Sequence, residues 1–131
     1  LIGWQDLQSL FPKWHELELA TREAILNACG ELAQKLHAGG LVQRCFYPKH
    51  VFLKPNGSGF ATCLIDLEKA RHYYLCKNGC LRDLYDFHKL TKACLSKDEF
   101  ARFLGAYLNQ PPESEAVARL FAKAANYHQA A

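Results

Sequence analysis

The sequence contains no methionine, no long apolar run and little net charge. Because translation starts at methionine, and a large second residue such as leucine normally retains it, we expect Leu1 not to be the native start. The 131 residues are then a piece of a longer protein. No apolar stretch approaches the ~20 residues of a membrane-spanning helix, and no signal-peptide pattern opens the chain. These absences exclude a membrane-spanning helix but not peripheral attachment to a membrane.

The net charge of +3 is too small to indicate a nucleic-acid-binding protein, so we expect no nucleic acid partner. The charge is unevenly distributed, because residues 44–92 carry nine basic and four acidic side chains. The segments on either side are balanced or slightly acidic. The basic middle indicates either a site that meets anions such as phosphates or a solvated basic surface.

Half of the residues are hydrophobic and 22% are charged, which is typical of a folded globular domain. A chain of this length forms a single domain with one sizeable core. The six cysteines are spread through apolar or helical surroundings, whereas a disulfide-built domain would be smaller and richer in loops. We therefore expect reduced thiols and a cytoplasmic protein.

Helical signals dominate the chain. Apolar residues recur at helical spacing from Thr21, the expected N-cap, to the glycines at 39 and 40, which predicts a helix over residues 21–37. Residues 4–19 are interpreted as a short helix or loop. Three later helices are predicted over residues 81–94, from the Ser96–Glu99 capping box to Pro111, and from Ser114 to about residue 126.

A β-hairpin is predicted between the first of these helices and the other three. Residues 51–54 and 60–65 have strand composition, and Asn56–Gly57 is a strong turn signal between them. Asp66 follows the second strand. The predicted fold is therefore mainly α with a small β-hairpin.

The segment QRCFYPKH, residues 43–50, has the spacing of a kinase catalytic loop. Protein-kinase-like folds place a loop H-R-D-x-x-x-x-N before two short strands and a metal-binding aspartate. Arg44 and Cys45 fall on the R-D pair, and His50 falls on the asparagine. Asp66 falls on the metal-binding aspartate.

Four segments in order resemble the lipopolysaccharide kinase family, which comprises the Kdo/WaaP kinases and the related InaA proteins. They are GLVQRCFYPKHVFL, LIDLEKAR, LRDLYDFHKL and SKDEFARFLGAYL, and they cover roughly residues 30–108. The resemblance implies that residues 1–131 are the single C-terminal lobe of a two-lobe protein-kinase-like fold. No segment supplies the Gly-rich strands and phosphate-anchoring lysine of the N-terminal lobe, so we expect this piece alone to be inactive.

The resemblance also implies a reaction and its site. The complete protein would use ATP and Mg²⁺ to phosphorylate a sugar hydroxyl of the lipopolysaccharide core, or another anionic acceptor, at the inner face of a Gram-negative cytoplasmic membrane. Asp66 would bind Mg²⁺, with His50 at the second ligand position, although imidazole suits Mg²⁺ less well than an oxygen ligand. Lys49 and Arg71 are candidates to face phosphates. Asp83 is predicted to be structural, accepting backbone N–H bonds from its own helix start or from the loop near Arg44.

Cys45 departs from the family pattern, because kinases of this family that act on core sugars have aspartate there. A thiol substitutes poorly for a carboxylate as a proton acceptor unless it is ionised. The InaA-like branch also tends to cysteine at this position. Two functions therefore stay open, a catalytic lobe with Arg44 and Cys45 at the reacting centre, and a pseudokinase that serves binding or stress regulation.

Structural roles and other chemistries compete with this interpretation. Asp66 could cap a turn, Cys45 could be a small buried hydrophobe, and His50 could hold the loop. Cys76 and Cys80, with His72 upstream, have loose zinc-site spacing but lack a second ligand pair. A hydrolase built from Cys45, His50 and Asp66 would need an oxyanion hole, for which the sequence gives no sign.

Overall fold

The computed structural model describes residues 3–43, 46–65, 71–72 and 79–127, with residues 71–72 described by their backbone alone. The described part is mainly helical, with two small antiparallel sheets. Its elements are β1 (Gln5–Asp6), α1 (Leu7–Leu10), a 3₁₀ helix (Phe11–Glu16), α2 (Leu19–Ala38), β2 (Leu41–Val42), a 3₁₀ turn (Pro48–His50), β3 (Val51–Asn56), β4 (Gly59–Leu64), β5 (Arg71–His72), α3 (Gly79–Thr91), α4 (Lys97–Leu108) and α5 (Glu115–Ala125).

The predicted hairpin is present, but its turn lies one residue later than expected. β3 pairs with β4 from Val51↔Leu64 to Asn56↔Gly59, so the two turn residues are Gly57 and Ser58. Gly57 has a φ of 65°, and among the non-glycine described residues only Asn109 has positive φ. A positive φ at the first turn position alone is typical of a type II′ turn, which favours glycine there. The Asn56–Gly57 signal therefore placed the turn one residue early.

The first long helix begins two residues before the expected N-cap. Glu18 is the N-cap of α2, and the Arg22 N–H already donates to the Glu18 carbonyl at 3.0 Å. Thr21 therefore lies inside the helix rather than at its start, which corrects the sequence prediction. The C-terminal end agrees with the prediction, because the Gly39 N–H closes the last turn on the Lys35 carbonyl.

The later helices follow their local signals closely. Ser96 and Glu99 form the capping box at the start of α4, and the Ser114 side chain caps α5. The predicted helix over residues 81–94 begins earlier, at Gly79, and ends earlier, at Thr91. Beyond Thr91 the chain forms a turn, in which the N–H groups of Cys94 and Leu95 both donate to the Thr91 carbonyl.

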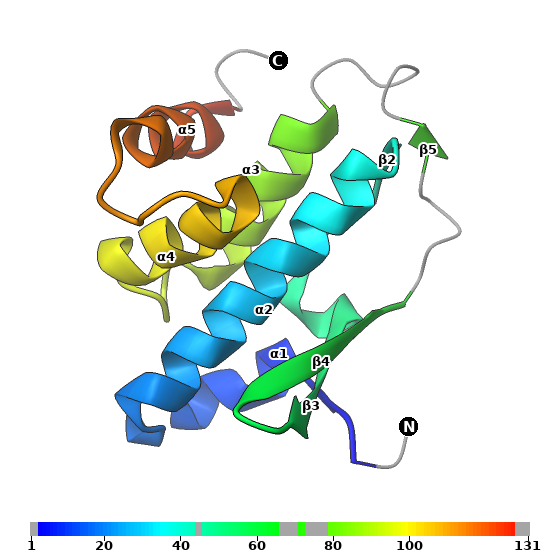
Figure 1. Cartoon of the computed structure of the whole chain (residues 1–131), viewed down its shortest axis with the longest axis vertical. Coiled ribbons are helices and arrows are strands. Elements are labelled where there is room, and N and C mark those ends of the chain that lie inside the picture. The colour runs from blue at the N-terminus through cyan, green and yellow to red at the C-terminus, as the bar shows by residue number, and fades with distance from the viewer. Residues whose placement is uncertain (1–2, 44–45, 66–70, 73–78, 128–131) are drawn as a thin grey trace.

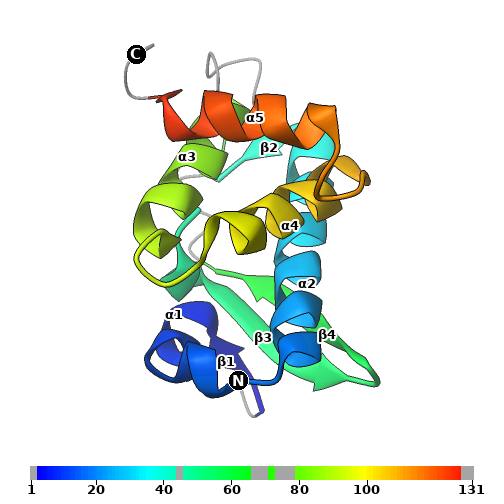
Figure 2. The ribbon, with the colours of Figure 1, turned by 90° about the vertical axis from the view of Figure 1, so that its left-hand side faces the viewer.

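Helix α2 crosses the molecule between the β3–β4 hairpin and helices α3 to α5 (Figure 1). The β3–β4 hairpin lies along one side of α2 and α4 packs against the other, with α3 and α5 on the same side as α4 (Figure 1). Seen from the side, α5 lies across the end of the molecule above α3 and α4 (Figure 2). Within the described residues, no helix has both the length and the apolar character required to cross a bilayer.

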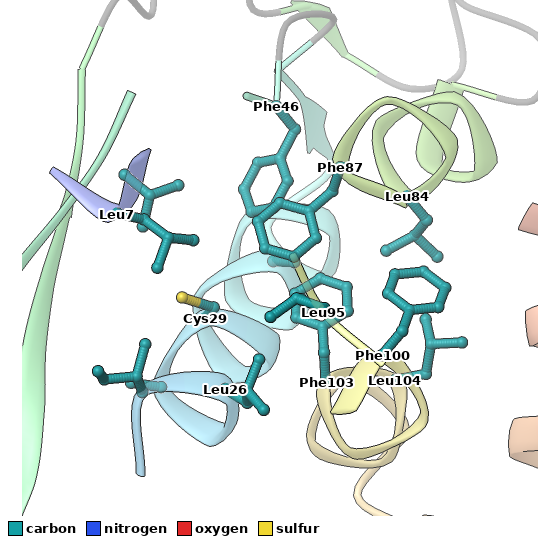
Figure 3. Packing of buried hydrophobic residues seen from close by; sticks show 14 of the residues in the cluster. Leu7, Leu26, Cys29, Phe46, Leu84, Phe87, Leu95, Phe100, Phe103 and Leu104 are labelled. Atoms are coloured by element: carbon teal, nitrogen blue, oxygen red, sulfur yellow. The ribbon is translucent and has the colours of Figure 1, made fainter. Parts of the chain in front are cut away.

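The core is aromatic where α3 meets α4. The rings of Phe87 and Phe103 stack with centroids 4.4 Å apart, and Phe46 packs on Phe87 at 5.5 Å. Figure 3 shows these rings between α2 and the neighbouring helices, with Cys29 and Leu26 on the α2 side. Because Phe46 is fully buried, the core holds the segment that carries the predicted catalytic loop.

The N-terminal segment is fastened to α4 through one side chain. Trp14 is fully buried, and its indole Nε1 donates to Glu99 Oε2 at 2.9 Å. The other carboxylate oxygen of Glu99 accepts from the Ser96 N–H. Glu99 therefore caps α4 and fixes the short helices that precede α2.

Candidate active site

The predicted catalytic loop connects β2 to β3. Gln43, at its start, is fully buried, and its backbone N–H donates to Asp83 Oδ2 at 2.8 Å. Asp83 lies in the second turn of α3, not at the helix start as the sequence predicted, and is also fully buried. The hydrogen bond that it accepts comes from the residue before Arg44, which is one of the two contacts predicted for it. Arg44, Cys45 and Asp66 lie outside the described residues.

Asp83 belongs to a buried hydrogen-bond chain that joins three helices. The same Oδ2 atom lies 2.8 Å from His37 Nε2 on α2, and His37 Nδ1 lies 2.6 Å from the Tyr107 hydroxyl on α4. Burial, followed by the charges of Cys80 and Asp83, raises the pKa of Tyr107. The phenol therefore stays protonated and shares a hydrogen bond with Nδ1, while Nε2–H donates to the carboxylate.

Sequence reasoning did not assign His37 or Tyr107 to the site. Both residues occupy core-facing helical positions, four residues after Ala33 and after Phe103. A histidine on an apolar helical face indicates a buried polar partner, and this is the sequence signal that points to the contact of His37. The partner itself is 46 residues away and could not be named from spacing.

Two hydrogen bonds join the loop to the end of β4. The Gln43 side-chain Nε2 donates to the Ile65 carbonyl at 3.1 Å, and the Ile65 N–H donates to the His50 carbonyl at 3.0 Å. Ile65 is the residue before Asp66. Both ends of the loop over residues 43–50 are therefore bonded to the residue that precedes the predicted metal ligand.

His50 is buried, with 8% of its surface exposed, and its ring stacks on Tyr47 with centroids 5.6 Å apart. The exposed Lys49 places its Nζ 5.9 Å from the centre of the Tyr47 ring. Arg71 is paired with Val42 across β2 and β5, which places its backbone beside the start of the loop. His50, Lys49 and the backbone of Arg71 thus border the same loop.

The competing chemistries gain no support from the part of the chain that the structure describes. No group of three or more His, Cys, Asp or Glu side chains that could hold a metal ion occurs among these residues. Cys80 is a free thiol in the first turn of α3, and burial raises its pKa, with Asp83 adding to the effect. Cys76 lies outside the described residues, as does the side chain of His72.

Asp86 lies one turn after Asp83 and has only 5% of its surface exposed. Burial raises the pKa of its carboxyl group to about 6, while Arg82 and Lys89 oppose the rise and Asp83 adds to it. Within the described part of the chain Asp86 has an ion pair with Arg82, whose Nε is 3.7 Å from Asp86 Oδ2. Proton uptake by Asp86 in the folded state is therefore favoured at mildly acidic pH.

Asp86 is predicted to make the fold more stable as pH falls. Its folded pKa of about 6 exceeds the ordinary 3.8, so its stabilising contribution is complete below pH 3.8 and is lost as pH rises through about 6. Compared with Asp86→Asn, the wild type is expected to gain up to about 3 kcal/mol in free energy of unfolding between about pH 7.5 and about pH 4. Urea unfolding of both proteins at several pH values measures this. A difference that does not change with pH would contradict the raised pKa.

The described elements have the arrangement of the C-terminal lobe of a protein-kinase-like fold. The chain belongs to the lipopolysaccharide kinase (Kdo/WaaP) family, whose model matches residues 1–107. Among solved structures, WaaP in complex with acyl carrier protein is similar, with a TM-score of 0.75 and 23% sequence identity. The match covers 95% of this chain and 57% of the WaaP chain. No curated protein sequence matches the chain significantly.

These comparisons confirm two expectations from the sequence, the family and the mainly helical kinase-like fold with its small hairpin. The chain spans little more than half of the WaaP chain that it resembles. The individual roles of Arg44, Cys45, Asp66, His50, Lys49 and Arg71 stay predictions.

Proposed function

We propose that this chain is the C-terminal lobe of a phosphotransferase that, when complete, transfers the γ-phosphoryl group of ATP to a sugar hydroxyl of the lipopolysaccharide core. Family membership supports the reaction class. The observation that carries the proposal is the double attachment of Ile65, through Gln43 and His50, to the loop over residues 43–50. Phosphoryl transfer depends mainly on positioning, and this attachment holds the two halves of the predicted site together.

Asp66 would hold Mg²⁺, with His50 at the second ligand position. A carboxylate at position 66 suits this ion, because Mg²⁺ in such sites takes one or two carboxylates and completes its coordination with phosphate oxygens and water, whereas the imidazole of His50 is the weaker ligand. The Ile65 N–H donates to the His50 carbonyl, so the residue that precedes Asp66 in the sequence is bonded to His50. When bound, Mg²⁺ neutralises phosphate charge. The chain's own residues orient the reactants, with Arg44 and Cys45 at the acceptor hydroxyl and Lys49 and Arg71 toward phosphates.

The test is a transfer assay with the full-length protein, Mg²⁺-ATP and a delipidated lipopolysaccharide core. Wild type is expected to transfer phosphate, and Asp66→Ala is expected to abolish transfer because the metal loses its carboxylate ligand. Asp98→Ala, which changes an exposed carboxylate on α4, is the matched control and should keep full activity. Transfer that survives Asp66→Ala would refute the metal role. Turnover by the 131-residue chain alone would refute the requirement for a second lobe.

Cys45 favours a second candidate, a pseudokinase that acts as a binding or stress-regulatory module. Under this function ATP binds weakly or not at all, and a thermal-shift titration with Mg²⁺-ATP leaves the melting temperature unchanged. Cys45→Asp restores the usual proton acceptor and is then expected to create transfer that the wild type lacks. High wild-type turnover with a normal ATP-dependent thermal shift would rule the pseudokinase out.

The proposed acceptor also sets the proposed location. A kinase of lipopolysaccharide core sugars meets its substrate at the inner face of the cytoplasmic membrane of a Gram-negative cell. The basic middle of the sequence would then serve a peripheral contact with an anionic surface. Fractionation of cells into soluble and membrane parts, with and without a salt wash, tests this location.

A further inference from the structure

A small cavity of about 290 Å³ opens beside the predicted catalytic loop. It lies where the 3₁₀ turn Pro48–His50 contacts both α1 and α3. Its lining consists of Gln8, Tyr47, Lys49, Asp86, Lys89 and Leu90. The volume is at the low end for ligand pockets, which suits one sugar ring better than an oligosaccharide.

Asp86 is the unusual member of this lining. Its side chain is more than nine-tenths buried, and among the described residues none donates a hydrogen bond to its Oδ2. The Arg82 Nε, at 3.7 Å, is beyond hydrogen-bond distance. A buried carboxylate oxygen without a donor is costly, so Oδ2 marks Asp86 as a side chain whose hydrogen-bonding capacity is not filled. Asp86 also lines the cavity, where its carboxylate is the acceptor that hydroxyl groups of a bound molecule would meet.

The rim of the cavity has the opposite charge. Lys49 and Lys89 are both exposed and approach the cavity from the loop and from α3. Two ammonium groups disfavour a cationic ligand, and the Asp86 carboxylate disfavours a bare phosphate deep in the cavity. A ligand with hydroxyl donors at one end and an anionic group at the other satisfies both the Asp86 carboxylate and the two rim lysines. The Tyr47 ring offers an apolar wall of the kind on which a sugar ring packs.

We propose that this cavity binds one acidic or phosphorylated sugar residue, with its hydroxyls donating to Asp86 and its anionic group between Lys49 and Lys89. The proposal rests on the proposed function, because the bound sugar would belong to the phosphoryl acceptor. Tyr47 is two residues along the sequence from Cys45, which is predicted to lie at the reacting centre.

The first test is calorimetric titration of the 131-residue chain, without ATP, with five probes. Galacturonate and glucose 6-phosphate are the anionic sugars, galactose and glucose are their neutral parents, and inorganic phosphate is the bare anion. The proposal predicts that at least one anionic sugar binds about tenfold more tightly than its neutral parent and than phosphate. Preference for the acid or for the phosphate identifies the anionic group. Equal binding of phosphate and sugars, or no saturable binding of any sugar, would overturn the proposal.

Three variants locate the binding. Asp86→Ala and Lys89→Gln are each expected to weaken binding of the preferred sugar about five- to tenfold, whereas Lys92→Gln, an exposed lysine outside the lining, leaves it unchanged. Because Lys89 is exposed, Lys89→Gln keeps its fold even if Asp86→Ala does not. Binding that both Asp86→Ala and Lys89→Gln leave intact would place the sugar elsewhere.

Kinetic measurements on the complete protein distinguish the proposed sugar subsite from the proposed phosphoryl-transfer reaction. Lys89→Gln is expected to raise KM for the core acceptor with little change in kcat, because the subsite binds a part of the acceptor that does not react. Sugar binding by the chain without any transfer by the complete protein would refute the proposed function and keep the subsite. Transfer with an unchanged acceptor KM in Lys89→Gln and Asp86→Ala would refute the subsite and keep the function.

Discussion

Replacing Asp83 by alanine is expected to lower the free energy of unfolding by about 3–5 kcal/mol, the cost of leaving two buried donors without their carboxylate acceptor. Asp83 is fully buried, and its Oδ2 accepts from the Gln43 N–H and from His37 Nε2. Alanine leaves both donors inside the protein without an acceptor. Urea unfolding of the two proteins at neutral pH measures the difference.

The Asp83 network predicts more than a loss of stability. His37→Ala alone should also destabilise, but adding it to Asp83→Ala should cost less than the sum, because the shared hydrogen bond is already gone. Asp98→Ala is the control for removal of an exposed carboxylate and is expected to cost less than about 1 kcal/mol. Additive losses for Asp83 and His37 would show that the two side chains do not act together.

The contact between Asp83 and the loop could be predicted because its signals are local and ordered. The kinase-like motif order brings the helix of the sequence LRDLYDFHKL to the loop, although Asp83 lies in the second turn of that helix rather than at its start. The rest of the hydrogen-bond chain, from Asp83 through His37 to Tyr107, could not be predicted. It depends on how closely α2, α3 and α4 approach one another, which no spacing within one helix contains.

The ends of the helices and strands show the same contrast between local signals, which were predictable, and long-range contacts, which were not. The capping box Ser96–Glu99 and the Ser114 cap were predicted correctly, since each forms within four residues. The start of α2 was predicted wrongly because Thr21 has a favourable N-cap side chain, yet Glu18 already begins the helix without one. The two-residue strands β1, β2 and β5 were not predicted, because strands so short exist only through their partners.

Replacing Gly30 by alanine is expected to destabilise the protein by about 2–3 kcal/mol through overpacking of the contact between α2 and α4. A Cβ atom at Gly30 would lie 2.3 Å from the Phe103 carbonyl oxygen, 2.7 Å from Ala106 Cβ and 3.0 Å from the Tyr107 N. Two of these atoms belong to the α4 backbone and cannot turn away. Alanine is favoured over glycine inside a helix by only about 1 kcal/mol. The steric clash outweighs this gain, so the substitution lowers the free energy of unfolding. Thermal and urea unfolding measure the loss.

Gly59→Ala is the matched control, because a Cβ there meets nothing within 4 Å and the same Gly-to-Ala change should be neutral or slightly stabilising. Gly30→Ala also has a second consequence for the site. The clash pushes on the backbone of Tyr107, whose hydroxyl holds His37 in the chain that ends at Gln43. The NMR signals of the His37 ring and the Gln43 amide should therefore shift in Gly30→Ala but not in Gly59→Ala. A Gly30→Ala protein as stable as wild type, with both signals unmoved, would mean that α4 is not held against α2 at this point and that the helix contact does not set the position of the loop.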